Sequence, residues 1–272
     1  VPGYHEYDIS GWFLLFFTVF FGMIFGDGGY GLLLTFAAVV GMILTVSKGK
    51  KIGAGLGLLM LLGLATVGWG TVTCTWFGLS IEQIPDWLKN LSVKPLSSAF
   101  VDEYSGRPGV TTVTQNLQIF CFSLALLQLT VAHIKAIAKN IKSLKALGDF
   151  GALIELWGMF YVVLAMVVDG TIFSFDKIVY GIPIGTVSIA LVLAGFGLNF
   201  IFANYDGSIV ASIMESVKNI ISVLLGVVNV FSDIVSYIRL WAVGLAGAAI
   251  SNTVNQMAGP MWGRLAMLAT FI

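Results

Sequence analysis

SDIVSYIRLWAVGLAG, residues 232–247, places Arg239 inside an apolar segment that runs from about residue 208 to residue 253. The guanidinium group keeps its proton at every relevant pH. A charge at the centre of a membrane-spanning helix costs about 2.5–3.5 kcal/mol on insertion scales. Because an idle charge of this cost would be hard to tolerate, Arg239 is the first candidate functional residue.

The composition of the chain indicates whether it folds in water or in a membrane. Of its 272 residues, 58% are hydrophobic and 10% are charged, whereas soluble domains carry about 25% charged residues. These values predict an all-α polytopic membrane protein. The formal net charge is +0, and no basic stripe of the kind that binds nucleic acid is present, so nucleic acid is excluded as a partner.

Apolar stretches separated by polar turns predict about eight transmembrane helices, with both ends of the chain inside. The stretches cover residues 12–46 (two helices joined at 26–29), 52–77, 112–134, 148–168, 181–202, 208–253 and 260 onward. The positive-inside rule places two lysine-rich loops in the cytoplasm. Their lysines are Lys48, Lys50, Lys51, Lys135, Lys139, Lys142 and Lys145. Residues 78–111 then form the longest outer loop.

The segment 208–253 is unusually long for one span. As a single helix it would measure about 68 Å, more than twice the roughly 30 Å hydrocarbon core. We therefore expect a strongly tilted or broken penultimate helix, with Gly226, Gly244 and Gly247 as points of bending or close approach. A last helix is expected to begin near Pro260.

The two ends of the sequence suggest a piece of a longer protein. Val1 opens a polar lead-in without a signal-like basic region, and the sequence is still apolar at Ile272. We expect a single transmembrane domain over residues 1–272 whose last helix is cut. Cys74 and Cys121 lie in apolar segments without metal or disulfide spacing, and no cofactor or metal site is expected.

One helical face around Arg239 is small or polar. Its members, at three- and four-residue steps, are Ser232, Val235, Ser236, Arg239, Ala242, Val243, Ala246 and Ile250. Asp233 lies six residues from the arginine and about 120° off this face, so it offers no i, i+4 ion pair. Two interpretations remain open. Either Arg239 pairs with Asp27, Glu155 or Glu215 of its own chain, or it faces a carboxylate or substrate from outside.

The other polar residues carry weaker signals. In the turn Gly26-Asp27-Gly28-Gly29-Tyr30-Gly31 the glycines permit unusual dihedral angles and Asp27 can accept backbone N–H bonds, which favours a structural role. Glu215 either lines an aqueous path or is a first-turn acid.

Glu155 lies about 10 Å into its helix, where it is either hydrated or able to meet Lys142 or Lys145. Gln128 and His133 are interpreted as packing residues.

Two motifs carry a resemblance to a known family. FFGMIFGDGGYGLLL (residues 20–34) and SYIRLWAVGLA (residues 236–246) resemble the membrane sector of the a subunit, or I subunit, of V-type and A-type rotary ATPases. The motifs stand some 200 residues apart in the family's order, and the resemblance covers nearly the whole chain. It implies a stator ion-channel subunit in which Arg239 lies against a rotor ring of c (proteolipid, K) subunits, each with a membrane-embedded carboxylate.

The resemblance also implies the ion path and the partners. Two aqueous half-channels carry H⁺ or Na⁺ to and from the ring, and the candidate lining residues are Ser232, Asp233, Ser236, Glu215 and Glu155. An N-terminal cytoplasmic domain, not present here, would bind peripheral-stalk subunits, and membrane lipid surrounds the rest. Gly244 and Gly247 favour a bacterial or archaeal cell membrane. No Gly-x-x-x-x-Gly-Lys-Ser/Thr loop occurs, so ATP hydrolysis would belong to partner subunits.

Two alternatives come from other functional classes. A secondary transporter could bind an anionic substrate at Arg239, although such proteins often contain inverted repeats with paired broken helices, which this sequence does not display. A structural membrane anchor for a soluble stalk would use Arg239 in a buried ion pair.

Overall fold

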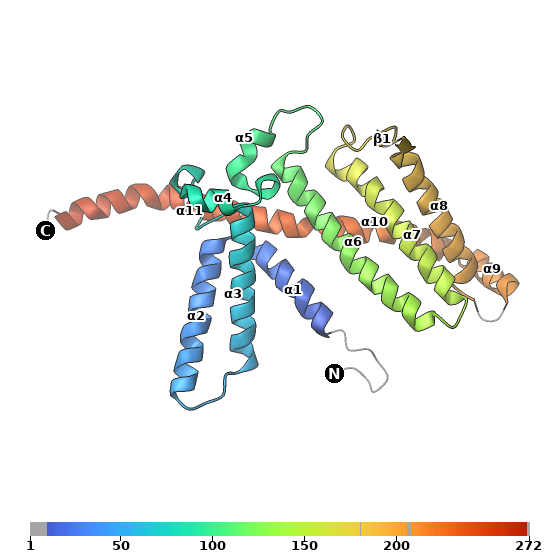
Figure 1. Ribbon diagram of the computed structural model, residues 1–272, viewed down its shortest axis with the longest axis horizontal. Helices are drawn as coiled ribbons and strands as arrows, with labels where there is room; N and C mark the ends of the chain where they lie inside the picture. The colour runs from blue at the N-terminus through green and yellow to red at the C-terminus, as the bar shows by residue number, and fades with distance from the viewer. Residues whose placement is uncertain (1–9, 180, 206–207, 271–272) are drawn as a thin grey trace. The chain divides into compact units, whose positions relative to one another are not determined.

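The computed structural model describes residues 10–179, 181–205 and 208–270, with side chains described as far as Gly259. Within these ranges the regular structure is helical apart from one short β-hairpin (Figure 1). Six helices are long and apolar enough to cross a membrane, so the chain is a multi-pass membrane protein. The chain folds as two compact units. Unit 1 combines the residues up to Gly106 with those from Arg239 onward, and unit 2 is Arg107–Ile238.

In unit 1, α2 (Gly28–Ser47) and α3 (Ala54–Thr73) form a hairpin, and α1 (Ser10–Phe25) packs on α3 (Figure 1). Glycines make this packing close, because a Cβ at Gly63 would lie 2.5 Å from Thr35 Oγ1. Other glycines in or next to α3 have open space around them. These are Gly53, Gly55, Gly57 and Gly68.

The expected outer loop of residues 78–111 is folded into short helical turns. These are η1 (Ile81–Gln83), α4 (Asp86–Leu91), η2 (Lys94–Leu96), η3 (Ser98–Phe100) and α5 (Val101–Tyr104). A small core of Cys74, Ile84 and Leu88 holds the turns together. The Ser98 hydroxyl donates to Thr73 O at 3.0 Å, which attaches the segment to the end of α3.

In unit 2, α6 (Val113–Asn140), α7 (Lys145–Val163) and α8 (Ile184–Phe202) run side by side (Figure 1). The π-helical turn η4 (Leu164–Val168) extends α7. Helix α7 is central, because it packs against α6, α8 and α10. The buried core side chains include Phe122, Leu126, Leu156, Val163 and Ile234.

Asp169 organises the end of unit 2 that carries the hairpin of β1 (Ile178–Val179) and β2 (Ile182–Pro183). Its carboxylate accepts hydrogen bonds from the hydroxyl and N–H of Thr171, from Ile172 N–H and from Gln115 Nε2. These bonds lower the pKa of Asp169 to about 2, and the two from Thr171 contribute most to the shift. The bond from Gln115 ties the beginning of α6 to the end of α7.

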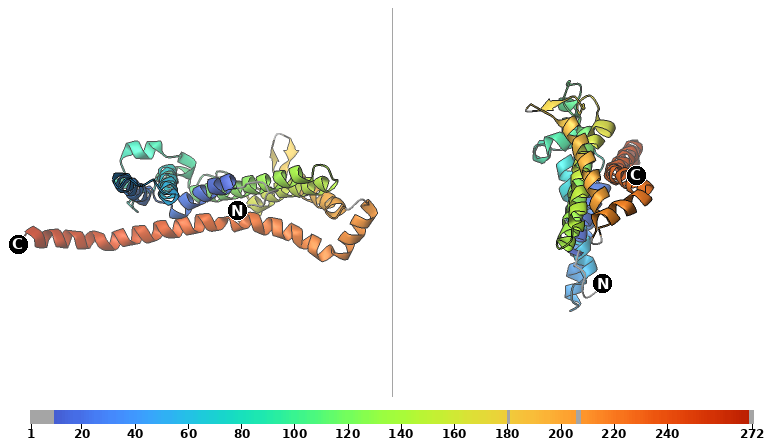
Figure 2. Two further views of the ribbon diagram at one scale, coloured as in Figure 1. Left: turned by 90° about the horizontal axis from the view of Figure 1, so that it is seen from below. Right: turned by 90° about the vertical axis from the view of Figure 1, so that its right-hand side faces the viewer.

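The long apolar element is broken in two places that the sequence did not indicate. Helix α9 (Ile209–Lys218) ends before Asn219, α10 (Ile220–Ser236) ends before Tyr237, and α11 (Ile238–Thr270) follows. Figure 2 shows the angle between α9 and α10. The first break has a tertiary cause: the hydroxyl of Ser212 donates to Ile201 O at 2.7 Å, and this bond holds α9 against α8.

The expected bends at glycine are therefore wrong. Gly226 and Gly247 stand within helices, and a Cβ at either would meet nothing within 4 Å. Gly244 serves instead for close approach, since a Cβ there would lie 2.6 Å from Met23 O of α1.

The expected count of eight spans is not reached in the described ranges. They contain six helices of spanning length and the shorter α1. The helix expected to begin near Pro260 is not separate, because α11 continues through that position to Thr270; membrane helices tolerate proline when the freed backbone groups are satisfied elsewhere. The 40-residue apolar stretch Ile220–Gly259, interrupted at Tyr237, is thus the last described span rather than the penultimate one.

Candidate functional site

The arginine predicted to be functional lies two residues after Tyr237, where the helix is interrupted between α10 and α11. Tyr237 ends α10 with φ −72° and ψ −13°, and its N–H bonds to both Ile234 O and Val235 O. Arg239 is the second residue of α11 and is exposed. The charge therefore sits at a helix junction on the surface of the chain.

The polar residues before the junction lie on the side of α10 that does not pack. Ile234 is fully buried against α6 and α7, whereas Ser232 and Asp233 are exposed and Ser236 is half-buried. The Ser236 hydroxyl donates to the main-chain oxygen of Asp233 at 2.8 Å. The structure thus brings these three candidates together on the open side of the last turns of α10.

The two glutamates predicted to lie near an ion path occupy different surroundings. Glu215 is exposed and belongs to α9, not to the long helix on which the sequence analysis placed it. Glu155 in α7 is only 2% exposed. Its Oε1 has no hydrogen-bond partner among the described residues. Of the two expected partners, neither Lys142 nor Lys145 forms an ion pair with it among the described residues, because Glu155 packs closely against Gly195 of α8.

The carboxylate of Asp27 is engaged by four backbone groups. Gly29 N–H and Phe77 N–H each donate to Oδ1 at 2.8 Å, Tyr30 N–H donates at 3.3 Å, and Gly78 N–H donates to Oδ2 at 2.9 Å. Two of these donors begin α2 and two follow α3. Asp27 therefore caps one helix and clamps a segment 50 residues further along.

The glycines of this turn let the clamp close. Gly26 has a φ of +66°, a value that favours glycine. A Cβ at Gly28 would lie 3.1 Å from the Trp76 ring, and one at Gly29 would lie 2.4 Å from the Phe77 ring. The clamped segment also meets α11, where Asn255 Nδ2 donates to Phe77 O.

A cavity lies beside the clamp. Its volume is about 340 Å³, and its lining includes Asp27, Thr75, Trp76, Ala248 and Asn252. The buried Trp76 Nε1 has no acceptor among the described residues. A cavity of this size that contains polar groups can hold water, which would supply that acceptor.

One residue of the site was missed in the sequence. The hydroxyl of Tyr237 donates to Oε1 of Gln128 at 2.7 Å, which ties the end of α10 to α6. Gln128 had been interpreted as a packing residue, and Tyr237 had not been singled out at all. The available signal was a tyrosine hydroxyl in an apolar segment, since such a group needs a partner when it is buried.

We predict that a double-mutant cycle will detect this bond. Tyr237→Phe and Gln128→Met should each destabilise the protein by about 1–2 kcal/mol, because each leaves the other group unpaired. The double variant should lose less than the sum, with a coupling of about 1 kcal/mol. Chemical unfolding in detergent measures all three values.

Tyr161→Phe is the matched control for this cycle, because the Tyr161 hydroxyl donates to Ser174 O and shares no partner with Gln128. Its effect should add to that of Gln128→Met. Strict additivity between Tyr237→Phe and Gln128→Met would contradict the role given to the bond.

Taken together, the fold and site define a class: a multi-pass helical membrane protein with an exposed arginine just after an interruption in a long apolar helix. No family model matches the chain. Individual relatives do. The chain is 42% identical over 262 residues to V-type ATP synthase subunit I 1 of Treponema pallidum, a match covering 96% of the chain and 39% of the relative.

Two further relatives carry related names. V-type ATP synthase subunit I of Borreliella burgdorferi is 34% identical over 268 residues, covering 96% of the chain and 40% of the relative. A-type ATP synthase subunit I of Methanocaldococcus jannaschii is 25% identical over 276 residues, covering 95% of the chain and 37% of the relative. The chain is therefore similar, over nearly its whole length, to I subunits of V-type and A-type ATP synthases, and it spans about two fifths of their length.

In the described part of the chain, no three His, Cys, Asp or Glu side chains come close enough together to hold a metal ion.

Proposed function

We propose that this chain is the stator ion-channel part of a V/A-type rotary ATPase, in which Arg239 couples the passage of H⁺ or Na⁺ to rotation of a ring of c (K) subunits. The observation that carries the proposal is an exposed arginine within an apolar, membrane-length helix, in a chain whose relatives are named as ATP synthase I subunits. Peripheral-stalk subunits would join through parts of the full protein beyond this chain.

The physical reason for an arginine lies in the charge of a passing ring carboxylate. Two opposite charges about 4 Å apart attract by about 4 kcal/mol at an effective dielectric constant near 20. A ring carboxylate opposite Arg239 is then held ionised, whereas the same group facing lipid must be neutral or loaded with an ion. Rotation past the arginine requires the carboxylate to release its ion on one side and to take one up on the other.

The neighbouring residues have supporting roles in this proposal. Ser232, Asp233 and Ser236 would line the polar approach to Arg239, and the exposure of the first two is consistent with that role. Glu215 and Glu155 are candidates for the inner half-channel. Glu155 would serve only if water reaches it, because it is buried in the present conformation.

The turn at Gly26–Gly31 serves the proposal as scaffold. Its clamp fixes the segment after α3, which contacts α11 through Phe77. The chain that carries Arg239 is thereby held against the rest of unit 1.

The two alternatives make weaker use of the same observations. A secondary transporter would need a substrate site at Arg239, and the cavity beside Asp27 is lined by other residues. A structural anchor would have no use for the polar, exposed Ser232 and Asp233 beside the arginine.

Disulfide cross-linking tests whether this face meets the ring. Ser232→Cys and Val243→Cys place thiols at exposed positions, and we expect both to cross-link to a cysteine introduced beside the ring carboxylate. Ile234→Cys is the control, because Ile234 is fully buried against α6 and α7. The native Cys74 and Cys121 are buried and give little background. Failure of both exposed positions, or equal cross-linking from Ile234→Cys, would contradict the proposal.

A further inference from the structure

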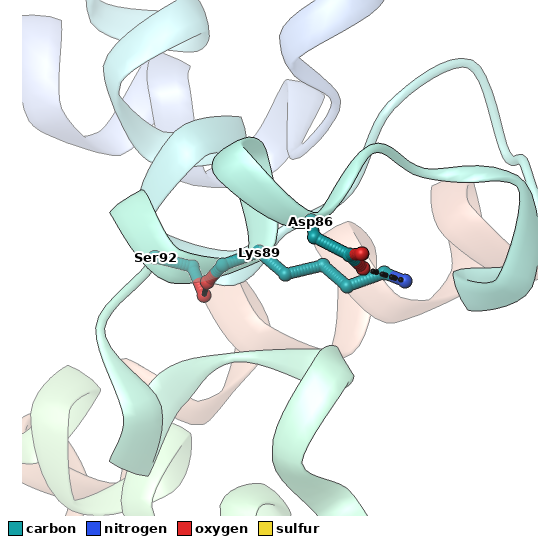
Figure 3. Close-up of polar contacts among 3 residues, drawn as sticks. All are labelled: Asp86, Lys89 and Ser92. Carbon is teal, nitrogen blue, oxygen red and sulfur yellow. Dashed lines mark hydrogen bonds and ion pairs between the residues drawn. The ribbon is translucent and has the colours of Figure 1, made fainter.

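Three lysines of the chain have a partner within the fold. In the folded outer loop, Lys89 pairs with Asp86 at 3.1 Å (Figure 3), and Lys94 Nζ lies 5.4 Å from the centre of the Phe100 ring. At the hairpin end of unit 2, Lys177 Nζ donates to Ile172 O at 2.8 Å. Each of these ammonium groups already has a partner within the fold.

The loop between α6 and α7 is different. Lys139, Lys142 and Lys145 are exposed, and none of the three has a hydrogen-bond, ion-pair or ring partner among the described residues. Residues 135–149 contain four lysines and one aspartate, which gives a net charge of 4 − 1 = +3. The one acid, Asp149, already accepts a hydrogen bond from Asn140 Nδ2 at 2.7 Å.

Helix stability does not account for this cluster. Lys139, in the last turn of α6, interacts favourably with the helix dipole, but Lys145 is the first residue of α7, where a positive charge is unfavourable. No acid occupies the first turn of α7 to offset it.

Apolar side chains alternate with these lysines. Ile141 is 71% exposed, and Leu144 and Leu147 are 40% and 41% exposed. The loop is held tightly by main-chain bonds such as Ser143 N–H to Asn140 O at 2.8 Å. Because the loop directly connects two membrane-spanning helices, it lies where acyl chains give way to headgroups. Exposed aliphatic side chains can contact the acyl chains, and unpaired ammonium groups can contact the headgroups.

We propose that the α6–α7 loop is a binding surface for anionic phospholipid headgroups, formed by Lys139, Lys142 and Lys145 with Ile141, Leu144 and Leu147. Each lysine near an anionic membrane surface contributes about 1 kcal/mol of attraction. Three unpaired lysines on a preformed loop therefore give a strong preference for phosphatidylglycerol-like lipids over zwitterionic ones. This surface is independent of Arg239 and of the ion path.

The test uses a fluorophore on Ser143→Cys, in the full-length protein within its complex, reconstituted into lipid nanodiscs. Ser143 is exposed, whereas Cys74 and Cys121 are buried, and labelling is checked against protein without the substitution. Headgroup-spin-labelled phosphatidylglycerol should quench the fluorophore with an apparent affinity about tenfold or more above that of spin-labelled phosphatidylcholine. Salt near 1 M should reduce this preference.

Two triple variants separate a specific surface from a general charge effect. Lys139→Gln, Lys142→Gln and Lys145→Gln together should bring the preference to within about twofold. Lys89→Gln, Lys94→Gln and Lys177→Gln remove the same charge from partnered sites and should leave it unchanged. Equal quenching by both lipids in the unaltered protein, a preference that survives the loop variant, or a label that neither lipid reaches because a protein segment covers it would each overturn the proposal.

Discussion

Vesicles that contain the complex with Arg239→Gln are expected to show no measurable ATP-driven ion uptake. An attraction of about 4 kcal/mol between the guanidinium and a ring carboxylate corresponds to about a thousandfold bias toward the ionised form. Without this bias a loaded carboxylate passes the stator unchanged, so rotation no longer moves ions. ATP hydrolysis should persist, because no phosphate-binding loop lies in this chain. The measurement is dye-detected uptake alongside hydrolysis in the same preparation.

Two further variants sharpen this test. Arg239→Lys should also lose most uptake, since a desolvated ammonium can give up its proton whereas a guanidinium cannot. Arg107→Gln is the matched control: it removes an arginine that is exposed outside the apolar helices and should leave uptake unchanged. Full pumping by Arg239→Gln would disprove the coupling role. A variant that fails to assemble with its ring would favour the anchor alternative instead.

The membrane character of the chain, its main helices and its family could all be predicted from the sequence. Each depends on properties that are local or additive along the chain. Apolar length defines the spans, and two short motifs carry the family resemblance. The comparisons confirmed that resemblance along 96% of the chain.

The breaks in the long helix could not be predicted, because they depend on contacts between distant residues. Ser212 in α9 donates a hydrogen bond to Ile201 O, and Tyr237 donates one to Gln128, 109 residues earlier. Glycine positions did not predict the breaks. A glycine weakens a helix, but the helix bends there only when tertiary contacts bend it.

The candidate site shows the same division. That Ser232, Ser236 and Arg239 share a helical face follows from spacing alone. That Glu155 is buried without a partner for Oε1 depends on the close approach of α8 at Gly195, which helical periodicity does not encode. The roles of these residues in ion transport stay predictions.

Replacement of Asp27 is expected to cause the largest loss of stability of any single change in unit 1. Asp27→Ala removes the acceptor of four backbone N–H groups. The carboxylate is 4% exposed, so water does not readily replace it. Because a buried donor left without a partner costs about 1–3 kcal/mol, we expect a destabilisation of about 3–5 kcal/mol, at the upper end for single substitutions. Thermal unfolding in detergent measures it.

Asp27→Asn separates the effect of the lost hydrogen-bond acceptor from the effect of a smaller side chain, because asparagine and aspartate have nearly the same size. An amide oxygen can still accept at the Oδ1 position, but an NH₂ group at the Oδ2 position would face Gly78 N–H, donor against donor. We therefore expect a loss between those of the unaltered protein and Asp27→Ala. Asp86→Ala is the control, because it makes the same replacement at an exposed ion pair (Figure 3) and should cost less than about 1 kcal/mol. If Asp27→Ala and Asp86→Ala unfold at the same temperature, the four bonds to Asp27 do not hold α2 and the segment after α3 together.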